Sequence, residues 1–137
     1  DISFLKDLSK GTMYKVAKYS ISHQIALSRF ATNFALGGYI FPDQVVFLNS
    51  GFKVADNKKS IEIISNNIKD INLLPILIVP NRGILVPKLT SEKSEIIIQT
   101  LSMIFNRIPK SAKLNYLNKA EVQKITNMES EIYRKKL

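Results

Sequence analysis

The sequence predicts an α/β domain in which helices cover a small sheet. Three observations predict this class: one hairpin of apolar strands, helices that carry apolar stripes, and capping residues that precede those helices. The chain has 137 residues, enough for one domain that buries a core without a disulfide or a metal. We therefore treat residues 1–137 as a single domain. Because the chain begins at Asp1 and not at Met, we expect an N-terminal portion of the domain to be missing.

The first third of the chain predicts a long helix and then a short strand. Residues 12–36 carry apolar side chains on more than one helical face, which predicts one buried helix. The Gly37-Gly38 pair predicts its end, because glycine readily adopts the left-handed backbone that closes many helices. A turn at 41–44 then leads into a predicted strand at 45–48, which the turn residues 49–51 terminate.

The middle of the chain predicts a helix followed by the hairpin. The helix is indicated by isoleucines three and four residues apart, at Ile61, Ile64, Ile68 and Ile71. The hairpin consists of apolar, β-branched runs at 75–79 and 83–86 on either side of the turn 80–83. Strands without polar positions are buried on both faces. The turn between them is therefore predicted to be rigid.

Two more helices are predicted after the hairpin. Thr90 or Ser91 is the predicted N-cap of the third helix, and Glu92 lies in its first turn, where the helix dipole favours an anion. Asn118 and Glu121 have the spacing of a capping box. The helix that they begin is predicted to bury Val122, Ile125, Met128 and Ile132.

The composition excludes several classes of protein. The chain has no cysteine, so it has no disulfide scaffold, no thiol nucleophile and no zinc ribbon. No apolar run reaches the roughly 18 residues of a membrane span, and no secretory signal pattern is present. We therefore expect a cytoplasmic protein that does not enter a membrane.

The net charge leaves the choice of partner open. The sequence has 20 Lys and Arg against 11 Asp and Glu, a formal charge of +9. Solvated surface charge is our preferred interpretation, and a small anionic substrate is the second. Nucleic acid is disfavoured, because the cations are dispersed and do not form a stripe interleaved with aromatic residues.

Residues 37–137 resemble the class II aldolase/adducin family. The Ile40-Phe41-Pro42-Asp43-Gln44-Val45-Val46 segment resembles a Phe-Pro-Asp-Gln/His-Val-Val motif of that family. The strand–Asn-Arg-Gly–strand–helix order of 75–108 is similar to its strand–Asn-His-Gly–strand–helix, and 116–134 resembles the tails of its sugar-phosphate aldolases. The resemblance implies a three-layer α/β/α fold with a largely antiparallel central sheet, in a homo-oligomer.

The resemblance also implies a chemistry, from which this sequence departs. Family members cleave or form a carbon–carbon bond in a ketose phosphate and bind a divalent metal, usually zinc, through three histidines. Arg82 stands where the third histidine is expected, and the sequence has no His-x-His pair. A guanidinium has no lone pair for a metal. We therefore predict no metal ligand and no cofactor from this chain, although zinc belongs to the family.

Arg82, Asp43 and Tyr133 are the candidate catalytic residues, and Arg82 and Gln44 the candidate substrate-binding residues. Arg82 could bind a carboxylate or phosphate in a bidentate manner, or it is an exposed turn residue that pairs with solvent or Asp43. Asp43 and Gln44 precede the predicted strand, where a side chain can reach a pocket mouth, although an Asp after Pro is more often a turn former. Tyr133 is a candidate proton donor or a packing residue.

Two further groups have weaker functional interpretations. Glu92 and Glu95 share a helical face and could act as acid and base, but a solvated face is favoured. His23, the single histidine, is interpreted as a packing or surface residue.

Two functions therefore remain open. The first is an aldolase-like carbon–carbon lyase, or a metal-free and catalytically impaired relative. The second is a non-catalytic oligomerisation or scaffold module of the adducin type. Whether the chain is an enzyme stays open, and the expected partner is a small phosphorylated sugar or another anion.

Overall fold

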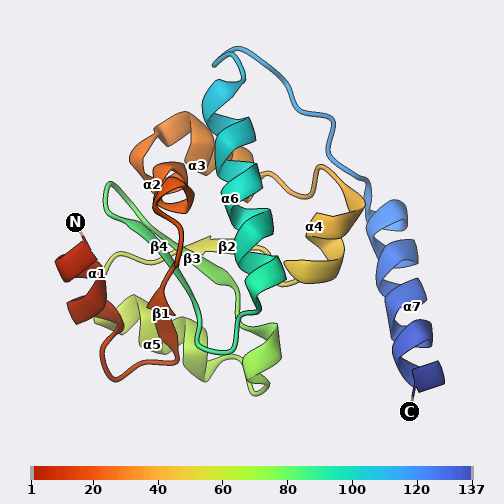
Figure 1. The fold of residues 1–137 in the computed structure, drawn as a ribbon, viewed down its shortest axis with the longest axis horizontal. Coiled ribbons are helices and arrows are strands. Elements are labelled where there is room, and N and C mark those ends of the chain that lie inside the picture. Colours follow the sequence, from red (N-terminus) through yellow and green to blue (C-terminus); the bar gives the residue numbers. More distant parts are fainter. Residues whose placement is uncertain (1, 137) are drawn as a thin grey trace.

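The chain folds into a mixed α/β structure, with a four-stranded sheet packed against helices (Figure 1). The computed structural model describes residues 2–136 and side chains as far as residue 130. In chain order the elements are α1 (Ile2–Ser9), β1 (Tyr14–Val16), η1 (Ser20–His23), α2 (Gln24–Leu27), α3 (Arg29–Leu36), α4 (Pro42–Phe47), β2 (Phe52–Val54), α5 (Lys58–Asn66), η2 (Ile71–Leu73), β3 (Ile76–Val79), β4 (Gly83–Pro87), α6 (Glu92–Arg107) and α7 (Lys119–Lys136).

The sheet has the strand order β1-β4-β3-β2 and is mixed. The β3 and β4 strands pair antiparallel, as do β1 and β4, whereas β2 and β3 pair parallel. The prediction of a largely antiparallel sheet is therefore wrong. The cause is the connection from β2 to β3, which runs through α5 and η2 and returns the chain in its original direction.

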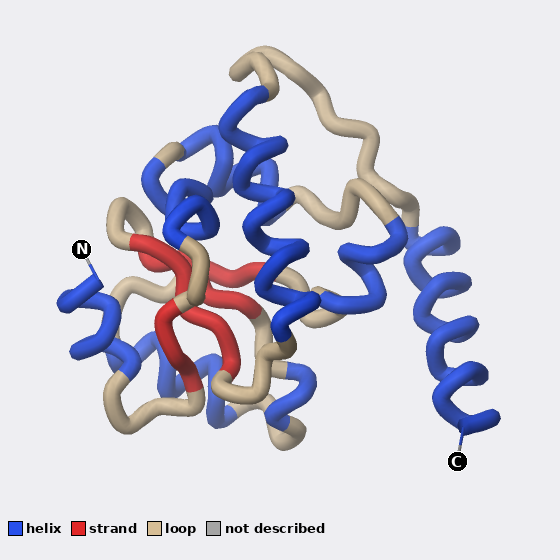
Figure 2. The backbone as a smooth tube through the Cα atoms, in the orientation of Figure 1, coloured by secondary structure: helices blue, strands red, loops and turns tan. Residues whose placement is uncertain are grey.

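The predicted hairpin is confirmed as β3 and β4, and both strands are fully buried. Successive side chains alternate between the two faces of the sheet. One face contributes Ile76, Ile78, Ile84 and Val86 to a core with α2, α3 and α6. The other face contributes Leu77, Val79 and Leu85 to a second core with α1 and α5. Helices therefore cover both faces of the sheet (Figure 2).

The single helix predicted over 12–36 is wrong. The chain forms β1, breaks at 17–19, and then forms η1, α2 and α3. The β1 strand pairs with the edge of β4, with Tyr14 opposite Pro87, and this tertiary pairing overrides the local helical pattern. Ser28 is extended and caps α3 by accepting a hydrogen bond from the Ala31 N–H. The predicted end at Gly37 is correct.

The strand predicted at 45–48 is also wrong, because residues 42–47 form α4. Pro42 occupies the first turn, where its fixed φ and missing N–H suit a helix start. Asp43 lies in the same turn, where the helix dipole favours a carboxylate. The apolar pair Val45-Val46 had suggested a strand, but the helix-start signal before it decides the local structure.

The helix predicted to carry Ile61, Ile64, Ile68 and Ile71 is confirmed only in part: α5 ends at Asn66, Ile68 lies in the loop after it, and Ile71 begins η2.

The α6 and α7 helices lie where they were predicted. Ser91 is the N-cap of α6, and its Oγ accepts the Ser94 N–H. Asn118 and Glu121 form a reciprocal capping pair at the start of α7. The predicted burial of α7 is largely wrong: it packs beside α4 (Figure 1), with Val122 and Ile125 half-buried and Met128 55% exposed. The side chain of Ile132 lies outside the described residues.

Across residues 2–136, none of the helices combines the length and apolar character that a membrane crossing requires.

Substitution of Gly83 should destabilise the fold more than substitution of a glycine in open space. A Cβ at Gly83 would lie 2.6 Å from His23 Nδ1 and 2.6 Å from Leu5 Cδ1, and φ is +156°. We expect Gly83→Ala to lower the free energy of unfolding by about 2–4 kcal/mol, because backbone strain and overpacking combine. Urea denaturation measures this free energy.

The control is Gly11→Ala, where φ is +76° and nothing lies within 4 Å of the new atom. Only about 1 kcal/mol of strain is therefore expected from this control substitution. Equal losses would contradict the close approach at Gly83.

His23 should make stability depend on pH near neutrality. Its Nδ1 accepts the Ile84 N–H at 2.9 Å, and its Nε2 lies 3.0 Å from the Ala17 carbonyl, so the ring is held neutral. Burial lowers the pKa of His23 from its ordinary value of 6.5. The unfolded chain therefore binds a proton that the folded chain does not. Stability should be fully present above pH 6.5 and fall as the pH drops through the folded pKa. Urea titrations across this range should show the slope, and His23→Gln should lack it. An equal slope in the variant would assign the dependence to other groups.

Candidate functional site

Arg82, the leading sequence candidate, lies on the exposed β3–β4 turn and faces α1. Its guanidinium carbon is 4.2 Å from the centre of the Phe4 ring, a cation–π contact. The neighbouring Asn81 adopts a left-handed backbone (φ 63°) and donates its N–H to the Ala26 carbonyl. The turn is therefore fixed against α1 and α2, and Arg82 contacts an aromatic ring and not Asp43.

Asp43 and Gln44 lie together on α4 but in different environments. Asp43 is exposed in the first turn. Gln44 is buried; its Oε1 accepts the Ile40 N–H at 2.8 Å, and its Nε2 donates to the Gly38 carbonyl at 3.1 Å. Both polar ends of Gln44 therefore hold the loop before α4. The side chain of Tyr133 lies outside the described residues.

A cavity lies at the other end of the hairpin from Arg82. We call it the α6 cleft, and its volume is about 210 Å³. It opens where β3 begins and β4 ends, between the end of α4, η2 and the start of α6. Its lining residues are Phe47, Leu48, Asn49, Ser50, Gly51, Ile71, Asn72, Leu74, Ile76, Pro87, Leu89, Thr90, Ser91 and Ser94. Arg82, Asp43 and Gln44 are absent from this lining.

The α6 cleft is lined by both polar and apolar side chains. Leu48, Leu74 and Ile76 are buried and form part of its apolar wall. Among the residues that the structure describes, the side chains of Ser50, Asn72 and Thr90 accept or donate no hydrogen bond, in contrast to Ser91 and Ser94. No residue of the lining has a side chain that titrates. The cleft therefore offers hydrogen-bonding groups but no proton-transfer group.

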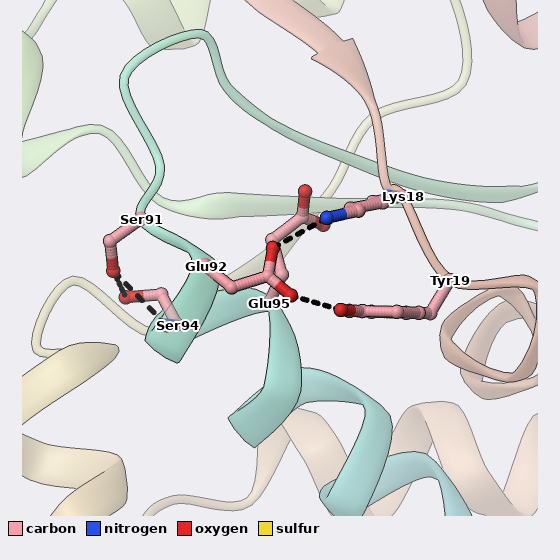
Figure 3. Close-up of polar contacts among 6 residues, drawn as sticks. All are labelled: Lys18, Tyr19, Ser91, Glu92, Ser94 and Glu95. Carbon is pink, nitrogen blue, oxygen red and sulfur yellow. Dashed lines mark hydrogen bonds and ion pairs between the residues drawn. The ribbon is translucent and has the colours of Figure 1, made fainter.

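The first turn of α6 is held in place on one side by serines (Figure 3). The Ser91 Oγ lies 3.0 Å from the Ser94 Oγ, which donates to the Phe47 carbonyl at the end of α4, also at 3.0 Å. This fixes the start of α6 against α4 at the wall of the cleft. The first backbone N–H groups of a helix lack intrahelical acceptors, and the dipole favours negative charge there.

Glutamates hold the opposite side of the same turn (Figure 3). Glu95 is buried at 3% exposure and accepts the backbone N–H of Lys18 at 2.9 Å. Glu92 is exposed; it pairs with the Lys18 Nζ at 2.8 Å and accepts from the Tyr19 hydroxyl. The hydrogen bond from Lys18, and after it that from Tyr19, lowers the pKa of Glu92. The same hydrogen bonds to Glu92 raise the pKa of Lys18 and the pKa of Tyr19. The two carboxylates thus fasten the segment after β1 to α6: Glu95 binds the backbone of Lys18, and Glu92 binds its side chain.

Sequence reasoning missed the cleft because its residues had been interpreted only as ends of elements. Ser50 belongs to the turn that terminates a predicted strand, and Thr90 was a candidate cap. Each is a local stop signal, and only the parallel return of the chain through α5 brings them together with Asn72. The available signal was a polar residue at the end of each element. That signal does not show which other element end lies beside it in the fold.

The described residues include no group of three or more His, Cys, Asp or Glu side chains arranged to hold a metal. Comparison with models of known protein families, with curated proteins and with solved structures gave no match. The resemblance to class II aldolases therefore stays a prediction.

Removal of Glu95 should cost more stability than removal of Glu92. Glu95→Ala takes away the acceptor of the Lys18 N–H from a buried position, and we expect a loss of about 1–3 kcal/mol. Glu92→Ala removes an exposed ion pair from the same helical turn, and the denaturation midpoint should hardly move. Urea denaturation of both variants is the measurement. An equal loss of stability in the two variants would show that the negative charge at the start of α6 stabilises the fold, and that the buried hydrogen bond of Glu95 contributes little.

Proposed function

We propose that the chain is a metal-free, non-catalytic relative of the class II aldolase/adducin proteins, and that it binds a small phosphorylated sugar or similar anion in the α6 cleft. One observation carries this proposal. The cleft presents unpaired hydroxyl and amide groups beside the start of a 16-residue helix, and no titratable side chain lines it. Such a lining can orient a polyhydroxylated ligand but cannot transfer a proton to or from it.

The order of the elements supports the family part of the proposal. The strand, Asn-Arg-Gly turn, strand and helix that the resemblance requires correspond to β3, β4 and α6. The position of the family's third metal ligand is Arg82, whose guanidinium lies over Phe4. A catalytically impaired relative accounts for both facts, because it keeps the architecture while the ligand position serves packing.

The volume of the cleft, the net charge of the chain and the dipole of α6 indicate the class of ligand. At about 210 Å³ it is smaller than the roughly 300–1,000 Å³ of sites for drug-sized molecules. The net charge of +9 and the positive end of the α6 dipole both favour an anion. The three-carbon ketose phosphate dihydroxyacetone phosphate combines a small size, one free hydroxyl, a carbonyl acceptor and a negative charge. Assembly into a homo-oligomer stays a prediction of the resemblance.

The hydroxyl of Thr90 should contribute to the affinity for dihydroxyacetone phosphate. Thr90→Val keeps the shape of the side chain but removes the hydrogen-bonding group, and we expect about tenfold weaker binding. Isothermal titration calorimetry measures the dissociation constant. The matched control is Thr100→Val on α6, whose hydroxyl donates to the Ile96 carbonyl away from the cleft, and it should bind as the unmodified chain does.

Three outcomes would contradict the proposal. Absence of saturable binding, or equal weakening in the two variants, would remove the cleft as the site. Cleavage of a ketose phosphate by the chain, with or without added zinc, would contradict a non-catalytic role.

A further inference from the structure

One end of the molecule is formed by two stretches of the chain that lack acidic residues. No Asp or Glu occurs between Asp7 and Asp43, or between Glu95 and Glu121. The first stretch supplies α2 and α3, and the second supplies most of α6 and the loop that follows it. They meet in space where the Tyr116 hydroxyl donates to the Phe34 carbonyl, and the upper part of Figure 1 shows α2 and α3 beside the C-terminal half of α6.

Four of the exposed cations on these stretches lie on α3, at the end of α6 and in the loop after it: Arg29, Arg107, Lys110 and Lys113. We call this surface, with its neighbours Leu27 and Phe30, the cationic end. The described residues contain one ion pair, between Lys18 and Glu92, so no carboxylate neutralises these four side chains. The Nζ of Lys110 lies 5.0 Å from the centre of the Phe30 ring, which places the loop after α6 directly on α3.

Apolar side chains are exposed among these cations. Leu27 is 55% exposed at the end of α2, and Phe30 is 40% exposed in the first turn of α3. Exposed aliphatic and aromatic groups flanked by cations are the combination by which proteins bind the interface of a bilayer: the apolar groups enter the acyl boundary and the cations contact anionic headgroups.

We propose that the cationic end binds the surface of an anionic lipid bilayer. Each Lys or Arg near such a surface strengthens binding about fivefold, so the cations act together. The surface field is restricted to roughly a Debye length, and the binding should weaken with added salt.

A bilayer suits this surface better than a single-stranded nucleic acid. Sequence-tolerant binding of single strands uses open aromatic rings on which bases stack. Phe30 is the exposed ring of the cationic end, and Lys110 already lies over it. Leu27 has no ring to stack on, but it can enter hydrocarbon.

The test is co-sedimentation of the full chain with vesicles of phosphatidylcholine alone or with about 30% phosphatidylserine. The chain should bind the anionic vesicles and not the neutral ones. Reversal of two charges in Arg29→Glu/Lys110→Glu should weaken binding by about 25-fold or more. The matched control Lys59→Glu/Lys69→Glu makes the same change of net charge on exposed residues of α5 and the loop after it, and it should stay within about threefold of the unmodified chain.

A second variant tests the apolar contribution. Leu27→Ser changes no charge and should weaken vesicle binding about tenfold with the same salt dependence. Circular dichroism and the melting temperature establish that each variant is folded; exposure of all the substituted side chains makes folding the expected result.

The proposal fails if the chain does not prefer anionic vesicles, or if the two double variants lose binding equally, since net charge alone would then explain the attraction. It also fails if the chain binds an oligothymidylate more tightly than vesicles at the same salt and Arg29→Glu/Lys110→Glu abolishes that binding. Nucleic acid would then be the partner of this surface.

Discussion

The burial of the β3–β4 hairpin on both faces is the constraint from which the layers of this structure follow. Ile78 and Ile84 point to one core, and Leu77 and Leu85 point to the other. Neither face can be left to water without exposing these aliphatic groups. The chain therefore has to supply helices on both sides. The α2, α3 and α6 helices cover one face, and α1 and α5 cover the other.

His23 links this hairpin to the segment that precedes it. A neutral imidazole accepts the Ile84 N–H and bonds to the Ala17 carbonyl, so it connects β4 to the chain just after β1. The ring approaches so closely that residue 83 has room only for glycine. Together with the hydrogen bond from Asn81 to Ala26, this contact fixes where α2 lies. The fastening of α6 through Glu95 and the Lys18 N–H then completes the same side of the sheet.

The parts of the fold that could be predicted from the sequence have local signals. The hairpin, α6 with its Ser91 cap, and the start of α7 each depend on residues within a few positions of one another. The β1 strand could not be predicted, because Tyr14 to Val16 becomes a strand only by pairing with β4, some 70 residues later. The position of Arg82 in its turn was predictable, but its contact with Phe4 was not. The α6 cleft depends on three element ends that only the folded topology brings together.

The dipole of α6 relates the two proposed surfaces and separates their causes. Its positive end borders the cleft, so the anion binding that we propose there would depend on backbone N–H groups and would need no side-chain cation. At its negative end, Arg107 lies in the last turn and complements the dipole, which gives that cation a structural reason to be present. Arg29, Lys110 and Lys113 lie outside α6, where the effect of its dipole falls off. Lys110 lies over the Phe30 ring and so has a contact within the fold. Arg29 and Lys113 have no carboxylate partner among the described residues, and the proposal of an anionic bilayer surface depends on this observation.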